Sequence, residues 1–191
     1  MRPFREDPPA LPTSSDPAHP APPATPEEVA LEAKQRAHWD AVEEVSELLH
    51  EERFREALET LREVLTADSK NPYAYYFLGV ALFEQGQVPP ARDAYVACLR
   101  LAPRHLGARV ALTHVLRQLG DLRGALQEGS VALAQAPADA DVLYAVGMAH
   151  YARGDEGAAK RFFHAFLEAG PEYESSEEVR QLLEQMGERP S

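Results

Sequence analysis

Several residue types are scarce in this sequence, and each scarcity excludes a class of protein. The one cysteine among 191 residues, Cys98, leaves no partner for an intramolecular disulfide and too few thiolates for a cysteine-based zinc site. Basic residues number 19 against 31 acidic ones, a net charge of −12, which argues against a nucleic-acid partner or an anionic membrane surface. No apolar run reaches the roughly 18 residues of a membrane-spanning helix, and the first residues lack the apolar core of a secretory signal. We therefore expect a cytoplasmic protein without direct membrane insertion.

Motifs for catalysis are missing as well. The sequence has no glycine-rich phosphate loop, no GxSxG and no HExxH, and its seven histidines show no metal-ligand spacing along one helix face. We expect no enzymatic activity, no cofactor and no metal site. Arginine outnumbers lysine 16 to 3 and alanine is abundant, a composition that hints at a GC-rich bacterial genome.

Proline is concentrated at one end, with nine of the 16 prolines within residues 1–26. Residues 1–24 are therefore predicted to be a disordered tail, because they combine missing backbone donors with few large apolar residues. Thr25, Pro26 and Glu28 form the pattern of a helix start, with Glu28 closing a capping box. A helical pattern continues to about Glu51, and its spacing leaves open whether this is one helix or two helices broken near Asp40.

The remaining chain repeats itself every 34 residues without gaps. Three positions of the repeat keep one residue type each. Glycine recurs at Gly86, Gly120 and Gly154, proline at Pro103, Pro137 and Pro171, and alanine at Ala57, Ala91, Ala125 and Ala159. Each unit holds two amphipathic segments, with a glycine that allows a left-handed turn between them and a proline that ends the second. A pair of this kind cannot bury its apolar face alone, so the pattern predicts stacked helix pairs.

This pattern resembles the tetratricopeptide repeat family over about residues 38–173. The clearest copy, 72–105, has acceptable residues at all eight signature positions, namely Tyr75, Leu78, Gly79, Leu82, Ala91, Tyr95, Cys98 and Pro103. Copy 106–139 has Gly129 in place of a large aromatic residue, copy 140–173 has Phe166 at a small position, and copy 38–71 is degenerate. The resemblance implies an all-α, right-handed superhelix of about four helix hairpins over 25–173, with flanking helices. Residues 174–187 are expected to form a capping helix, followed by a short tail, 188–191.

Members of this family bind partners in a concave groove lined by the first helix of each pair. By that resemblance, a protein or peptide segment would bind to Trp39, Tyr73, Tyr76, Phe83, His114, Arg117, Tyr144, Met148 and Tyr151. The clamp that some members use for acidic peptide tails is missing, since Val42, Ser46, Val80, Val110 and His114 occupy its positions.

The resemblance therefore indicates a non-enzymatic interaction module, an adaptor or scaffold. Two alternatives stay open at this point. Small members of the family act as secretion-type chaperones for aggregation-prone clients. Self-association would arise if a tail or terminal helix of one copy filled the groove of another, which would make the protein a homo-oligomer.

Overall fold

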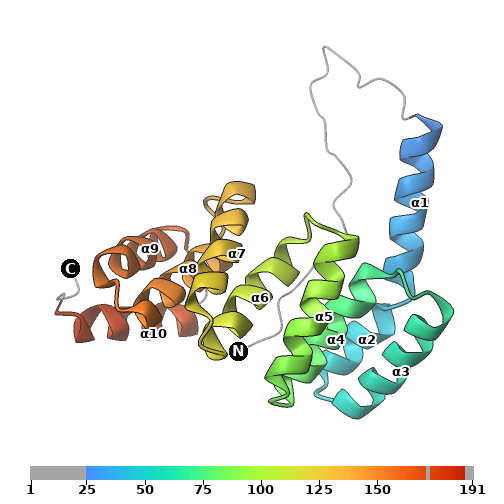
Figure 1. The fold of residues 1–191 in the computed structure, drawn as a ribbon, viewed down its shortest axis with the longest axis horizontal. Coiled ribbons are helices and arrows are strands. Elements are labelled where there is room, and N and C mark those ends of the chain that lie inside the picture. Colours follow the sequence, from blue (N-terminus) through green and yellow to red (C-terminus); the bar gives the residue numbers. More distant parts are fainter. Residues whose placement is uncertain (1–24, 171–172, 188–191) are drawn as a thin grey trace.

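The computed structural model of the protein describes residues 25–170 and 173–187, and the part that it describes is all-α (Figure 1). The predicted tails, 1–24 and 188–191, lie outside the described residues. Ten helices follow one another in these ranges: α1 (Pro26–Asp40), α2 (Glu43–His50), α3 (Phe54–Ala67), α4 (Pro72–Glu84), α5 (Val88–Leu101), α6 (Leu106–Gln118), α7 (Leu122–Gln135), α8 (Ala140–Arg153), α9 (Glu156–Glu168) and α10 (Tyr173–Gln185). Consecutive helix pairs stack into an elongated solenoid, in agreement with the predicted fold class (Figure 1).

The helices keep the 34-residue spacing of the sequence. The first helices α4, α6 and α8 begin at Pro72, Leu106 and Ala140, and the second helices α5, α7 and α9 begin at Val88, Leu122 and Glu156. Each first helix packs against the second helix of its own pair and against the second helix of the preceding pair. Equivalent residues of successive pairs therefore lie in rows along the solenoid.

Local signals in the sequence set the ends of these helices. Asn71 caps α4 through its side-chain oxygen, which accepts hydrogen bonds from the backbone N–H of Tyr73 and of Ala74. The glycine column adopts the left-handed conformation that was predicted, with φ of 72°, 80° and 81° at Gly86, Gly120 and Gly154.

The contact between the two helices of a pair depends on complementary side-chain size. A Cβ added to Gly79 would lie 2.5 Å from the Tyr95 ring, and one added to Gly147 would lie 2.7 Å from the Phe163 ring. In the pair between them the sizes are exchanged: Thr113 stands where those glycines stand, and Gly129 stands where the rings stand. In the sequence, Gly129 departs from the aromatic residue expected at its position. The structure explains this departure, because the larger Thr113 on the facing helix compensates for the missing ring.

The N-terminal segment consists of two helices rather than one. The chain turns at Ala41 and Val42, where the N–H of Val42 donates to the carbonyl of Trp39 at 2.8 Å and the Val42 side chain is fully buried. The predicted capping box at Thr25 and Glu28 is present. Helix α1, which precedes this turn, projects away from the stacked helices, whereas α10 packs on α9 at the other end (Figure 1).

None of the helices in the described ranges has the length and apolar character required to cross a membrane.

Candidate functional site

The nine residues predicted to bind a partner lie on four helices. Trp39 belongs to α1, Tyr73, Tyr76 and Phe83 to α4, His114 and Arg117 to α6, and Tyr144, Met148 and Tyr151 to α8. Because α4, α6 and α8 begin 34 residues apart, Phe83, Arg117 and Tyr151 occupy equivalent positions of successive first helices. Tyr76 and Tyr144 stand two repeats apart at a second such position.

Trp39 forms the packing contact between α1 and the solenoid. Its indole ring meets Tyr73 edge-on, with ring centroids 5.5 Å apart, and Phe77 at 6.1 Å. Tyr73 in turn lies 5.7 Å from the ring of His105, which caps α6. The N-terminal end of the predicted site is thus a chain of aromatic contacts, in which Trp39 and Tyr73 are each half-buried.

Two of the nine residues are buried and offer no surface to a partner in this structure. Tyr76 is 1% exposed, because its ring is enclosed by Phe77, Tyr95 and His105, and His114 is 4% exposed beside Tyr144. Burial lowers the pKa of His114 to about 3, with the nearby Arg117 charge acting in the same direction. Both side chains are packing residues between helices, a role that spacing alone does not distinguish from a surface role.

Tyr144 connects the first helices to the C-terminal helix. Its hydroxyl donates to a carboxylate oxygen of Glu178 at 2.9 Å, and its ring lies 5.5 Å from Phe166. Burial, together with the Glu178 charge, raises the pKa of Tyr144 above its ordinary value. Phe166 stands at a position that holds a small residue in most copies of the repeat, and here its ring packs against Tyr144.

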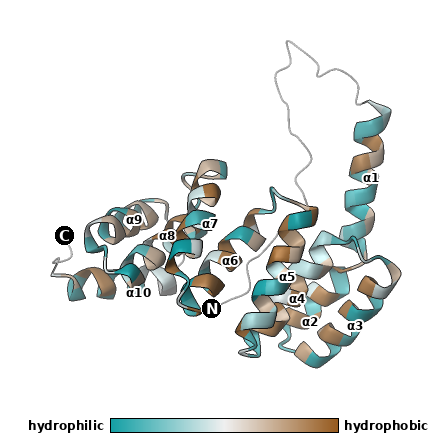
Figure 2. Ribbon diagram, viewed as in Figure 1, coloured by the Kyte–Doolittle hydropathy of each residue, from teal (hydrophilic) through white to brown (hydrophobic). Residues whose placement is uncertain are grey.

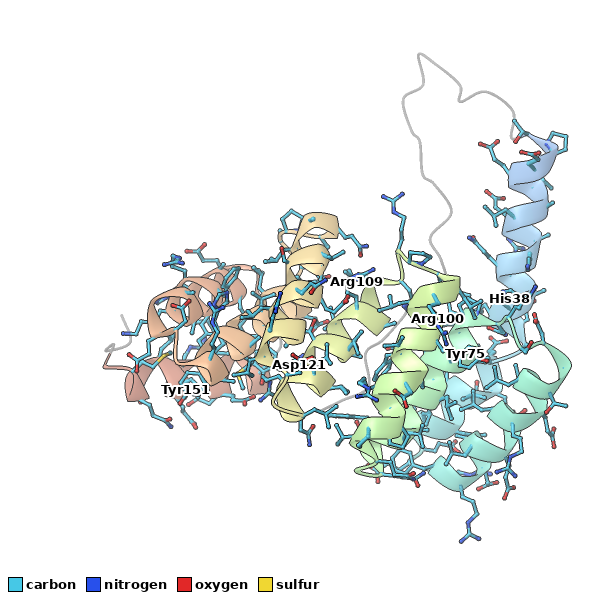
Figure 3. All side chains as sticks on the ribbon, in the orientation of Figure 1. His38, Tyr75, Arg100, Arg109, Asp121 and Tyr151 are labelled. Atoms are coloured by element: carbon cyan, nitrogen blue, oxygen red, sulfur yellow. The ribbon has the colours of Figure 1, made fainter. Side chains whose placement is uncertain are left out.

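Arg117 places a positive charge near the C-terminal end of α6. Its Nε atom is buried without a hydrogen-bond partner among the described residues, and its charge acts on Tyr144 and on His114. Arg109, by contrast, is held between α6 and α7, where it pairs with Glu128 and donates to the carbonyl of Pro103 at 2.5 Å (Figure 3). Arg117 is thus the better placed of the two to meet an external group.

Six of the nine side chains are half-buried on α4, α6 and α8, and we call them the first-helix face: Tyr73, Phe83, Arg117, Tyr144, Met148 and Tyr151. The binding role of all nine residues stays a prediction, and Tyr76 and His114 are the two among them that this structure buries.

Two clefts flank α3, a region that the sequence did not single out. One, of about 500 Å³, has Phe54 and Leu58 among its lining residues, and the other, of about 310 Å³, is lined by glutamates of α2 and α3 such as Glu47, Glu59 and Glu63. Neither cleft contains any of the nine predicted residues. Within residues 25–170 and 173–187, no three His, Cys, Asp or Glu side chains come together as a metal site.

Comparisons with known proteins agree with this architecture. A family model described as tetratricopeptide repeat matches residues 42–105. Among solved structures, TTC0263, a thermophilic TPR protein of Thermus thermophilus, is 21% identical with a TM-score of 0.69, over 78% of this chain and 83% of that chain. MamA of Desulfovibrio magneticus RS-1, from residue 41 to its end, is 22% identical with a TM-score of 0.66, over 78% of this chain and 85% of that chain.

A third solved structure contains a ligand. The first TPR of Spaghetti (RPAP3), bound to the HSP90 peptide SRMEEVD, is 20% identical with a TM-score of 0.56, over 63% of this chain and 97% of that chain. No curated protein matches the sequence.

Proposed function

We propose that this chain, whose residues 42–105 match a tetratricopeptide repeat model and whose fold is that of solved tetratricopeptide repeat structures, is a non-enzymatic adaptor or scaffold that binds a segment of a partner protein along the first-helix face. Tetratricopeptide repeats are protein–protein interaction modules. The RPAP3 repeat domain with its HSP90 peptide is a solved example of this fold holding a peptide.

The observation that carries the proposal is the row formed by Phe83, Arg117 and Tyr151. These residues are 34 positions apart on successive first helices, and each is half-buried. Partly exposed aromatic rings give a partner large contact area at low cost in side-chain entropy, and arginine adds a directional donor. A partner segment that runs along the solenoid would meet these three side chains in turn.

Acidic peptide tails of the HSP90 kind are not the expected ligand. Val42, Val80, Val110 and His114 occupy positions at which carboxylate-binding members have cationic or amide groups, and all four are buried. We therefore expect a partner segment recognised through apolar and aromatic side chains, with Arg117 supplying one polar contact.

The experiment is affinity capture from a native lysate with mass spectrometry, using the wild type and the variant Arg117→Ala/Tyr151→Ala. Loss of two central contacts is expected to weaken partner binding by about 30-fold or more, since each residue of this type contributes about 1–2 kcal/mol at an interface. The matched control is Val96→Ala/Val131→Ala, which removes two side chains, each 39% exposed, from the second helices α5 and α7.

A protein captured by the wild type and the control, and lost with Arg117→Ala/Tyr151→Ala at unchanged helicity, would support the proposal. Equal capture by all three chains would remove the first-helix face as the binding site. If the captured protein is insoluble when expressed without this chain, the role is that of a chaperone rather than of an adaptor.

A further inference from the structure

Helix α1 is fully formed although the solenoid hardly supports it. Every residue of α1 is exposed or half-exposed, and the helix meets the solenoid only through its last turn. There His38, labelled in Figure 3, pairs with Asp68 at 2.8 Å and accepts at its carbonyl from the Asn71 side chain at 2.8 Å. Trp39 packs on α4 beside it. The outer turns project into solvent (Figure 1).

The sequence of α1 specifies a helix strongly despite this isolation. Thr25 and Glu28 form the capping box, Glu27 adds negative charge to the first turn, and the interior contains alanine, leucine, glutamate, lysine and arginine, which are good helix formers. Isolated helices of about 15 residues are marginal in water even with such signals, so α1 would gain stability from packing on another surface.

One face of α1 has no partner among the residues that the structure describes, 25–170 and 173–187. Val29, Ala33 and Ala37 are spaced by four residues and Ala30 lies beside them, so the four side chains form one stripe, and all four are exposed. Val29 is 53% exposed and Leu31 is 56% exposed, the largest exposures among the large apolar side chains that the structure describes. Figure 2 shows α1 as a mostly hydrophilic helix interrupted by hydrophobic residues.

The charges on α1 are divided by half. The first half carries Glu27, Glu28 and Glu32, and the second half carries Lys34 and Arg36, with Asp40 as its last residue and His38 already paired with Asp68. Two α1 helices that pack in opposite directions about their centre place Glu32 of each beside Lys34 of the other, and the first half, with three acidic residues, beside a half with a net positive charge. Parallel packing would place like charges together, and for that reason the charge pattern selects the antiparallel arrangement.

We propose that α1 is a homodimerisation arm, which pairs antiparallel with α1 of a second copy of this chain along the stripe Val29–Ala33–Ala37. Ala33 is the middle residue of the helix, so a two-fold axis at Ala33 sets Val29 of each copy opposite Ala37 of the other. The alanines allow the two backbones to approach closely, and Val29 fills the space at either end. The interface is small, and a reversible dimer is expected.

The first test uses the full-length chain and two substitutions of the same kind on opposite sides of α1. Ala33→Glu puts a charge at the centre of the stripe, whereas Leu31→Glu puts the same charge roughly 160° away around the helix. The mass is measured by sedimentation equilibrium from micromolar to sub-millimolar concentration. The wild type and Leu31→Glu are expected to rise from 21.1 kDa towards twice that mass, and Ala33→Glu is expected to stay at 21.1 kDa.

A wild type that stays monomeric over this range, or an Ala33→Glu chain that dimerises as the wild type does, would overturn the proposal. Glutamate is a good helix former, so circular dichroism is expected to show equal helicity in all three chains.

The second test addresses the antiparallel arrangement. Glu27→Lys/Glu32→Lys makes the arm basic, and Lys34→Glu/Arg36→Glu makes it acidic. Each variant alone is expected to associate at least tenfold more weakly than the wild type, and an equimolar mixture is expected to regain association. Glu59→Lys/Glu63→Lys, at exposed positions of α3, makes the same change in net charge away from the arm and is expected to dimerise normally. A mixture no stronger than its components, or an equal loss in the α3 control, would contradict pairing through α1.

Discussion

The helix pair α6–α7 and the pairs on either side of it form the same contact with opposite assignments of side-chain size. In α4–α5 and α8–α9 a glycine of the first helix accepts an aromatic ring of the second, as Gly147 accepts Phe163. In α6–α7 the first helix supplies Thr113 and the second supplies Gly129, whose added Cβ would lie 2.8 Å from Val146 of the next pair. The comparison shows that the fold requires a filled volume at this contact and tolerates either helix as its source.

The middle pair also differs in polarity. Three of the five buried polar residues that the structure describes, Arg109, Thr113 and His114, lie on α6. His105 caps the same helix, where its Nδ1 accepts from the N–H of Ala108 at 3.1 Å. The pairs with an aromatic ring at the contact are thus held mainly by apolar packing, whereas α6 depends partly on polar side chains, among them Arg109, which pairs with Glu128, and Thr113, which donates to its own helix.

The largest effect is expected from emptying an aromatic contact. Phe163→Ala should lower the free energy of unfolding by about 3–5 kcal/mol, because a fully buried ring leaves a cavity next to Gly147. Thr113→Ala, the corresponding truncation in the middle pair, should cost about 1 kcal/mol, since it removes fewer atoms and a hydroxyl bonded to its own helix. Urea unfolding of both variants measures the difference, and equal losses would show that these two contacts do not differ in this way.

A second substitution attempts to impose the aromatic pattern on the middle pair. Gly129→Phe should cost about 3 kcal/mol, because Thr113 and Val146 already fill the space. Thr113→Gly in the same chain should return about 1 kcal/mol or more, which appears as coupling in a double-mutant cycle. Simple additivity of the two changes would show that Thr113 and Gly129 do not share one contact.

Acid should weaken α6 before the neighbouring helices. Burial lowers the pKa of His105 to about 4 and that of His114 to about 3, from an ordinary value of 6.5. The unfolded chain therefore binds protons that the folded chain does not, and stability falls as the pH drops from about 6.5 towards those values. Near pH 5 the loss is about 2 kcal/mol for each histidine.

Replacing one of these histidines isolates its share of the acid effect. In His114→Leu, the difference between the unfolding free energies near pH 7 and near pH 5 should shrink by about 2 kcal/mol. Hydrogen exchange near pH 5 should be accelerated most in α6 and α7. An unchanged pH dependence in the variant would mean that His114 has the same pKa in the folded chain as in the unfolded chain.

The smallest effect compares the same substitution in both kinds of pair. Gly79→Ala gains about 1 kcal/mol of helix propensity but forces a methyl group into the buried Tyr95 ring, so a net loss of about 1 kcal/mol is expected. Gly129→Ala meets only a methyl group of Val146 at close range, and its effect should lie within about 0.5 kcal/mol of zero. Thermal unfolding ranks the two variants, and the opposite ranking would contradict the size argument.

Much of the fold follows from signals that act over a few residues. The capping box at Thr25 and the left-handed turn at Gly86 are local, so the sequence predicts both, and the 34-residue spacing predicts the stacked pairs. The turn at Val42 has no such signal, because it contains neither glycine nor proline. It is stabilised by the burial of Val42 itself, which only the assembled core provides.

The candidate site is predictable to a lesser extent. Helical spacing places a residue on a face but does not say how closely the next helix covers it. Tyr76 and Tyr144 stand at equivalent positions, yet Tyr76 is enclosed by three neighbouring rings, while the Tyr144 hydroxyl reaches Glu178. The two tyrosines have different sets of neighbouring rings, since Tyr144 packs on His114 and Phe166, and this difference appears only once all the helices are packed.

Cys98 is a built-in probe of how often the α5 region opens. It is the sequence's one thiol and is fully buried in α5. A thiol reagent can reach Sγ only while α5 separates from its neighbours, so in native buffer the rate of labelling reports the free energy of that opening. The opening of repeat 72–105 can thus be measured without an engineered probe. Every substitution that destabilises this repeat should increase the rate at which Cys98 is labelled.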